Sequence, residues 1–327
     1  MRMLAGPITA IAALGVLAAP VYATFPGERG PIAFERVTKP RKSENPQIFT
    51  VAPRGGRARR LTSSAGGAFS PDYSPDGTRI LFERRFGGRS PDALFSMGRD
   101  GSDRVRLATA CAGECLGESG PGWAPDALRI VFERAFGPIV DDNASGLDLV
   151  VANPDGTGDQ TIRRFRPLEG EGREPHDAQW SPDGQRLAVN ILNIAAKPRN
   201  GSAIYTLNPD GSDLRQITPL RLNAGNPDWS PDGKRIVFNS SYEGQGRVDV
   251  YTVRPDGSGL RRVRREPRGS YSFDPVWSPD GRRIAFVHGA GRRFPHIWTM
   301  KPNGTGLRKV TRGPHPDFRP DWGTRPG

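Results

Sequence analysis

The sequence predicts an all-β protein, a six-bladed β-propeller with four antiparallel strands in each blade. Three observations lead to this prediction. An aromatic residue, a turn and an apolar strand recur in that order along the chain, a second turn phrase lies inside each interval, and the two chain ends supply complementary parts of one blade. Repeats of 45 to 57 residues that hold four short strands each are typical of propeller blades.

The first phrase is an aromatic anchor followed by a Ser-Pro-Asp-Gly turn and a strand, as in SPDGKRIVF after Trp229. Pro fixes the φ angle of the second turn position and Gly adopts positive φ without steric cost, so the phrase joins two antiparallel strands. The second copy reads Asp126-Ala127 instead. Because Ala is strained at positive φ, we expect this turn to differ locally. The six anchors are Tyr73, Trp123, Trp180, Trp229, Trp277 and Trp322.

The second phrase is a strand, another Asp-Gly turn and a short strand. One copy runs IYTLNPDGSD from Ile204 and is followed by a strand from Leu214 to Thr218. With the two strands of the first phrase, each interval therefore contains the four strands of a blade.

The chain ends predict how the ring closes. Strands at 32–36, 47–52 and 58–62 match the second, third and fourth strands of a blade whose first strand is missing. The segment 317–322 is a first strand with no blade after it. We expect the C-terminal strand to complete the N-terminal blade, since closure removes open sheet edges. The alternative is a five-bladed ring with a frayed N-terminus.

The N-terminus resembles an export signal. Arg2 precedes an apolar run from Ile8 to Ala19, and Val21-Tyr22-Ala23 has the small-x-small pattern of a cleavage site. We expect residues 1–23 to be a signal peptide and 24–327 to be one propeller domain. An uncleaved membrane anchor is the alternative, although the apolar run is short for a membrane span.

Cys111 and Cys115 are the only cysteines and lie in a Gly-rich segment. Export to an oxidising compartment favours a disulfide between them, with free thiols as the alternative. Two thiolates without nearby His make half of a zinc ligand set, so we expect no metal site there.

The Ser-Pro-Asp-Gly turns, the anchors before them and the strands in which an aromatic residue precedes Thr resemble the PD40, WD40-like repeats of TolB-like propellers. They are also similar to the N-terminal propeller of dipeptidyl peptidase IV-like proteins. The resemblance covers nearly all of residues 24–327 and implies the fold far more than the function. TolB carries an α/β domain before its propeller and the peptidases carry a hydrolase domain after it. We expect neither here, so membership of a Tol–Pal system stays open.

The sequence favours a protein without catalytic activity. It contains no G-x-S-x-G, H-E-x-x-H or Walker-type motif. The Asp-Gly turns lack the closing acidic ligand of a calcium-binding loop, so we expect no cofactor and no metal. Aspartates precede or lie near the anchors, and we expect them to cap backbone groups, with a polar channel lining as the alternative. They are Asp72, Asp177, Asp228, Asp274 and Asp321.

A binding site is expected on the face that carries the second-to-third and fourth-to-first strand connections, because these vary in length. We call it the variable face. The candidate binding residues on it are His176, His288, His296, His315, Arg41, Lys42, Arg292 and Arg293.

The formal net charge of +12 favours anionic partners, although an arginine-rich composition explains it equally well. We therefore expect a monomeric, exported binding module of the cell envelope or extracellular space. Its partner would be an envelope or extracellular protein or an anionic polymer. Membrane contact would be peripheral, and no nucleic-acid motif is present. The alternative is a polysaccharide lyase or hydrolase with a site at the propeller axis.

Overall fold

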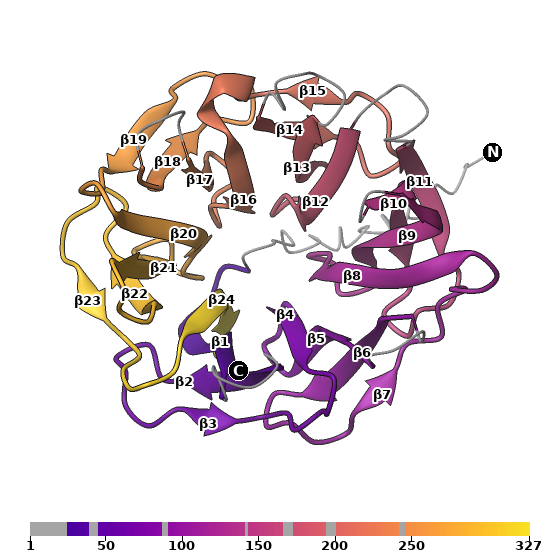
Figure 1. Ribbon diagram of the computed structural model, residues 1–327, viewed down its shortest axis with the longest axis horizontal. Coiled ribbons are helices and arrows are strands. Elements are labelled where there is room, and N and C mark those ends of the chain that lie inside the picture. Colours follow the sequence, from indigo (N-terminus) through magenta and orange to yellow (C-terminus); the bar gives the residue numbers. More distant parts are fainter. Residues whose placement is uncertain are drawn as a thin grey trace, which may run out of the picture.

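The computed structural model describes residues 25–38, 45–86, 91–140, 143–165, 173–193, 201–241 and 246–327. The strands form six antiparallel sheets of four strands, arranged as a ring around a central axis (Figure 1). The predicted fold class is therefore confirmed. The expected signal peptide, 1–23, lies outside the described residues. No helix within the described ranges is long and apolar enough to cross a membrane.

The blades are numbered here from the first complete sheet. Blade 1 contains β4 (Ala68–Tyr73), β5 (Arg79–Arg84), β6 (Ala93–Gly98) and β7 (Val105–Arg106). Blade 2 contains β8 (Cys115–Trp123), β9 (Ile130–Val140), β10 (Asn143–Ala152) and β11 (Gln160–Phe165). Blade 3 contains β12 (Arg173–Trp180), β13 (Leu187–Asn193), β14 (Ser202–Leu207) and β15 (Arg215–Gln216). Blade 4 follows the short 3₁₀ helix η1 (Leu220–Leu222) and contains β16 (Ala224–Trp229), β17 (Ile236–Ser240), β18 (Asp249–Val253) and β19 (Arg261–Arg264). Blade 5 contains β20 (Ser270–Trp277), β21 (Ile284–Ala290), β22 (His296–Met300) and β23 (Arg308–Lys309).

Blade 6 closes the ring with both ends of the chain. Its strand order is β24 (Asp317–Thr324), β1 (Arg29–Val37), β2 (Pro46–Val51) and β3 (Arg59–Arg60). Trp322 pairs with Ile32 across the seam, and its indole Nε1 donates to the carbonyl of Gly30 at 3.2 Å. The C-terminal strand therefore supplies the first strand of the N-terminal blade, as the sequence predicts.

The Ser-Pro-Asp-Gly turns share one set of hydrogen bonds. In blade 1 the amide of Gly77 donates to the carbonyl of Ser74 at 2.8 Å, and the Ser74 hydroxyl donates to Asp76 at 2.6 Å. The second copy keeps this turn, because the amide of Ala127 donates to the carbonyl of Ala124 at 3.0 Å and Ala127 has a φ of 57°. The backbone of this turn does not differ as predicted, but Ala124 lacks the hydroxyl that bonds to Asp in the other copies, and Asp126 accepts a hydrogen bond from Arg129 instead. The surrounding hairpin imposes the left-handed conformation on a residue that has a Cβ.

The anchors form the contacts between blades. Trp180 and Trp229 are 2% exposed. Trp180 of blade 3 shares a core cluster with Val131 and Leu149 of blade 2 and Val189 of its own blade. Each anchor therefore fills the space between its own sheet and the preceding one, which fixes the blades around the axis.

Candidate functional site

A β-bulge interrupts the first strand of every blade three residues before the anchor. The pairing register shifts at this point in all six sheets, for example between Phe69 and Asp72. The residue at the bulge has positive φ in each blade and lines the axis. These residues are Ser70 (48°), Gly120 (58°), Asp177 (54°), Asn226 (52°), Asp274 (48°) and Arg319 (44°). We call them the bulge ring.

The local sequence accounts for the bulges. Pro follows the bulge residue in five blades, and Pro has no amide hydrogen to donate to a strand partner, so it is placed at a bulge or an edge. Bulges redirect side chains and occur often beside functional sites. Non-glycine residues at positive φ also gather at such sites. The pattern of Pro two residues before an aromatic anchor is thus the sequence signal that could have revealed the bulge ring.

The aspartate directly before an anchor caps the next blade. The Asp72 carboxylate accepts a hydrogen bond from the amide of Trp123 at 2.7 Å, and Asp228 accepts one from Trp277 at 2.6 Å. Asp321 accepts one from Tyr73 at 2.7 Å across the closing seam. Burial raises the pKa of Asp321 to about 7. These three aspartates therefore cap backbone groups.

Asp177 and Asp274 belong to the bulge ring and face the axis. Asp177 accepts a hydrogen bond from the Asn226 side chain at 3.1 Å, and Asp274 accepts one from the amide of Arg319 at 3.1 Å. Burial raises the pKa of Asp274 to about 7, while the charge of Arg319 opposes this shift. Both expected roles of the aspartates, capping and axial lining, therefore occur.

Arg319 extends across the axis from blade 6. Its Nη1 donates to the Ser70 hydroxyl at 2.8 Å and lies 3.8 Å from Asp177 Oδ1 on the opposite side of the ring. Its Nε lies 3.7 Å from Glu35. The surrounding carboxylates raise the pKa of Arg319 although burial lowers it. Arg319 therefore narrows an axial hollow of about 90 Å³.

A larger cavity of about 550 Å³ opens beside the axial hollow on the variable face. The two share Gly120, Asp177 and Arg319. A Cβ on Gly120 would lie 2.2 Å from Glu133 Oε2, so the absence of a side chain in blade 2 makes room for this carboxylate. Two arginines, Arg85 and Arg319, line the cavity. Its five carboxylates are Glu83, Asp92, Glu118, Glu133 and Asp177.

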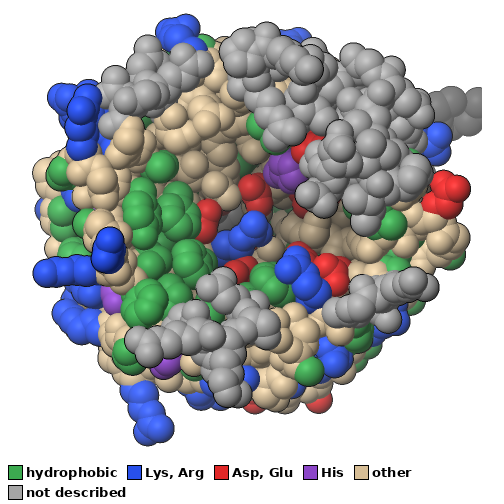
Figure 2. All heavy atoms as spheres, in the orientation of Figure 1, with side chains coloured by type: hydrophobic (Ala, Val, Ile, Leu, Met, Phe, Trp, Pro, Cys, Tyr) green, Lys and Arg blue, Asp and Glu red, His purple; other side chains and the backbone are tan. Residues whose placement is uncertain are grey.

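Charged groups gather at the centre of the variable face. Figure 2 shows acidic and basic side chains around the central hollow and an apolar patch to its left. Near the starts of β20 and β24, partly buried aromatic rings stack, with centroid distances of 5.5 Å between Tyr271 and Phe273 and 6.2 Å between Phe273 and Phe318. The variable face thus combines an acidic cavity, which we call the axial mouth, with an aromatic strip.

The carboxylates of the axial mouth differ in how they are neutralised. Arg85 pairs with Glu83 at 3.3 Å and with Asp92 at 3.0 Å. No ion pair joins Glu133 to another described residue, and Glu133 is 3% exposed. Burial raises the pKa of Glu133 to about 8, and the charge of nearby Asp177 adds to this effect. Burial likewise raises the pKa of Glu83 to about 7. These groups therefore hold protons near neutral pH.

His176 is the one predicted binding residue that lines the axial mouth within the described ranges. Its Nε2 lies 3.7 Å from Glu174 Oε2. Burial lowers the pKa of His176, but the hydrogen bond with Glu174 and the charges of Glu133 and Asp177 outweigh it and raise the pKa overall. His176 and Glu133 therefore line the same cavity.

The other predicted residues lie elsewhere. The Nδ1 atom of His288 lies 3.4 Å from Glu266 Oε1, and the His288 ring packs edge-on against the Trp298 ring. His296 is buried, and its Nδ1 lies 3.1 Å from Asp317 Oδ2. His315 lies before β24. Arg292 and Arg293 are exposed between β21 and β22, and Arg41 and Lys42 lie outside the described residues. His176, His288 and His296 thus contact separate carboxylates. The described residues contain no cluster of His, Cys, Asp and Glu that could hold a metal.

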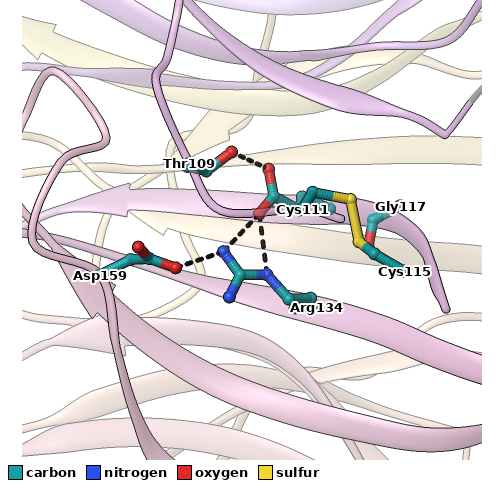
Figure 3. The surroundings of a disulfide bond; sticks show 7 residues. Thr109, Cys111, Cys115, Gly117, Arg134 and Asp159 are labelled. Atoms are coloured by element: carbon teal, nitrogen blue, oxygen red, sulfur yellow. Dashed lines mark hydrogen bonds and ion pairs between the residues drawn. A yellow bond between two sulfur atoms is a disulfide. The ribbon is translucent and has the colours of Figure 1, made fainter. Parts of the chain in front are cut away.

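A disulfide joins Cys111, in the segment before blade 2, to Cys115, the first residue of β8 (Figure 3). Nearby, Arg134 donates to Glu118 at 2.8 Å and to Asp159 at 2.6 Å, and Thr109 donates to Glu118 at 2.5 Å. This network fixes the start of β8 and holds Glu118, 1% exposed, at the wall of the axial mouth.

Comparisons with known proteins agree with this architecture. The family model of the TolB β-propeller domain, PD40, matches residues 168–323. The crystal structure of TolB from Acinetobacter baumannii superposes with a TM-score of 0.71 at 16% identity, covering 92% of this chain and 68% of that one.

Two curated relatives match shorter segments. The Tol-Pal system protein TolB of Alcanivorax borkumensis is 30% identical over 103 residues, 31% of this chain and 21% of its own length. The uncharacterized peptidase YuxL of Bacillus subtilis is 33% identical over 72 residues, 22% of this chain and 10% of its own length. These matches therefore span only small parts of the curated relatives. The chain is a six-bladed propeller whose residues 168–323 match the TolB β-propeller domain.

Proposed function

We propose that this protein is an exported binding module of the cell envelope or extracellular space, without catalytic activity, whose axial mouth receives a basic segment of a partner protein. The proposal rests mainly on the cavity of about 550 Å³ beside the axis, which is lined by five carboxyl groups and two arginines. Export rests on the N-terminal sequence, where Arg2 precedes the apolar run and Ala23 ends the cleavage pattern.

The chemistry of the axial mouth favours a cationic ligand. A guanidinium or ammonium group that enters could pair with the partly neutralised Asp177 and with Glu133, which would release its proton as the cation binds. The stacked rings beside the mouth offer apolar surface to the rest of the segment. This differs from the acidic partner expected from the net charge, because five carboxyl groups and two arginines line the cavity.

Binding of defined peptides tests this proposal. Fluorescein-labelled hexa-arginine and hexa-glutamate would be titrated against the protein by fluorescence polarisation. We expect hexa-arginine to bind despite the net charge of +12, and Glu133→Gln/Asp177→Asn to weaken it at least about tenfold, about 1.4 kcal/mol.

Arg292→Glu/Arg293→Glu is the control, since it changes exposed charges of the variable face and should leave hexa-arginine affinity within about twofold. If hexa-glutamate binds more tightly and this control abolishes its binding, the basic residues form the site and the proposal is wrong.

The placement of the buried Glu133 in the same cavity as His176 favours catalysis as a second candidate, since burial raises the pKa of Glu133 to about 8. A carboxylic acid that stays protonated near neutral pH can act as a general acid, and an imidazole can act as a base. A lyase or hydrolase acting on polysaccharide at the axis would use this pair. An assay for new reducing ends would test this candidate with polygalacturonate as substrate. Release of reducing ends by the wild type but not by Glu133→Gln would support it.

A further inference from the structure

A second polar surface lies on the opposite face, where the tight turns of the blades are. Two adjacent hollows of about 890 and 440 Å³ border the closing seam and share Arg29 and Arg325. The larger hollow is lined by Arg29, Arg54, Arg282, Arg283, Arg308 and Arg325. We call the two hollows together the arginine groove.

The internal repeat shows that the groove departs from the pattern of the other blades. In the hairpin between the third and fourth strands, four blades carry an Asp that accepts a hydrogen bond from the amide two residues later, at 2.8 to 3.0 Å. These residues are Asp100, Asp155, Asp210 and Asp256. The two hairpins that border the groove carry Asn303 and Arg54 instead.

Asn303 still caps its turn, because its Oδ1 accepts from the amide of Thr305 at 3.1 Å. The substitution therefore keeps the local structure and removes only the negative charge. Arg54 replaces the capping group altogether and reverses the charge. Turn stability accounts for Asp and Asn here but not for Arg.

A second position is Asp in blades 1 and 3 and Gly in blades 2 and 4, and neither hairpin at the seam carries an acidic residue there. In blade 3, Asp213 accepts a hydrogen bond from Arg186 at 2.6 Å. The equivalent residues at the seam are Gly306 in blade 5 and Arg57 in blade 6. Arg283, the blade 5 counterpart of Arg186, donates to backbone and hydroxyl oxygens at Gly306 and Thr299.

The arginines of the groove are therefore only partly neutralised. Arg29 pairs with Asp280 at 2.9 Å and Arg325 with Glu28 at 3.3 Å. Arg54, Arg282, Arg283 and Arg308 form no ion pair with another described residue. Burial lowers the pKa of Arg283, and the neighbouring charges of Arg29 and Arg308 lower it further. An anion placed in the groove would relieve this repulsion.

We propose that the arginine groove binds an acidic polysaccharide, with successive carboxylates paired to guanidinium groups along the two hollows. Guanidinium groups bind carboxylates through two parallel hydrogen bonds, which suits an extended chain that presents a carboxylate on each sugar. In the part of the chain that the structure describes, no aromatic residue lines either hollow, so nucleic-acid bases would find no aromatic stacking surface there. The arginine groove and the axial mouth lie on opposite faces. The proposal for the groove therefore does not depend on which ligand the axial mouth binds.

Restoring the repeat residues tests the proposal. Arg54→Asp/Arg57→Asp places at both positions the residues that blade 3 carries at Asp210 and Asp213, so the hairpin should fold. With size-fractionated polygalacturonate as the probe, we expect wild-type binding by calorimetry at low salt and at least about a tenfold loss of affinity in this variant. Asn303→Asp/Gly306→Asp changes the other bordering hairpin and should also weaken binding.

The matched control is Arg292→Asp/Arg293→Asp, which makes the same change of charge on the opposite face and should leave affinity within about twofold. Equal losses in the control and the groove variants would show that net charge alone attracts the polymer, and would overturn the proposal. Absence of wild-type binding would overturn it too. Tighter binding of a thirty-residue oligothymidylate than of polygalacturonate would overturn the assignment to polysaccharide.

Discussion

Replacing Glu133 with Gln should make the free energy of unfolding less dependent on pH. Glu133 is 3% exposed, and burial raises its pKa to about 8 in the folded protein. An unfolded Glu titrates at about 4.3, so between these values the folded state binds a proton that the unfolded state has released. Because the folded pKa is the higher one, Glu133 lowers stability as pH rises from about 4.5 through 8.

The structure sets the size of this effect. The shift corresponds to about 5 kcal/mol if nothing rearranges when Glu133 ionises. Water and side chains at the axial mouth can reorganise around the new charge, so we expect a loss of about 2 kcal/mol between pH 5 and pH 8. Glu83, Asp274 and Asp321 titrate in the same direction, each with a pKa of about 7, and remain in the variant.

Urea unfolding followed by tryptophan fluorescence at pH 5 and pH 8 measures the difference. The wild type should lose more stability across this range than Glu133→Gln, by about 2 kcal/mol. Glu114→Gln, at an exposed position, is the matched control and should behave as the wild type does. An identical pH dependence in wild type and Glu133→Gln would refute the reasoning, since the carboxyl would then be ionised in the folded state already.

Three further predictions concern the fold. Ala127→Gly should stabilise the protein by about 1 kcal/mol, because Gly adopts the φ of 57° without strain. Gly281→Ala, in the equivalent turn of blade 5 at a φ of 66°, should destabilise the protein by a similar amount. Thermal melts measure both changes, and a shift of the same sign in the two variants would contradict this prediction. Trp229→Ala should cost about 3–5 kcal/mol in urea unfolding, and a cost below about 1 kcal/mol would disprove its role as a core anchor. Deleting residues 317–327 should abolish cooperative unfolding and promote aggregation through the exposed edge of β1. Deleting only residues 326–327 is the control and should do neither. If the longer deletion gave a folded monomer in size-exclusion chromatography, ring closure would be dispensable.

The architecture was accessible from the sequence because its determinants are local and repeated. A Ser-Pro-Asp-Gly turn specifies a hairpin wherever it occurs, and an aromatic residue before it marks the end of a first strand. Matching the strands at the two chain ends then predicted the pairing of Trp322 with Ile32. The expectation for the backbone of Ala127 failed because the hairpin around it overrides the preference of a single residue.

The candidate site depended on the tertiary structure. Asp177 and Arg319 are far apart in the chain and meet only because six first strands converge on one axis, where bulges turn their side chains inward. Glu133 belongs to a second strand and was overlooked, although Glu recurs between Phe and Arg in three second strands, at Glu35, Glu83 and Glu133. The sequence by itself determined the blades, their number and their closure, which follow from short-range turn chemistry and periodic burial. Only the folded ring decided which charges share a cavity, because burial and the distance between blades, rather than composition, set the local electrostatics.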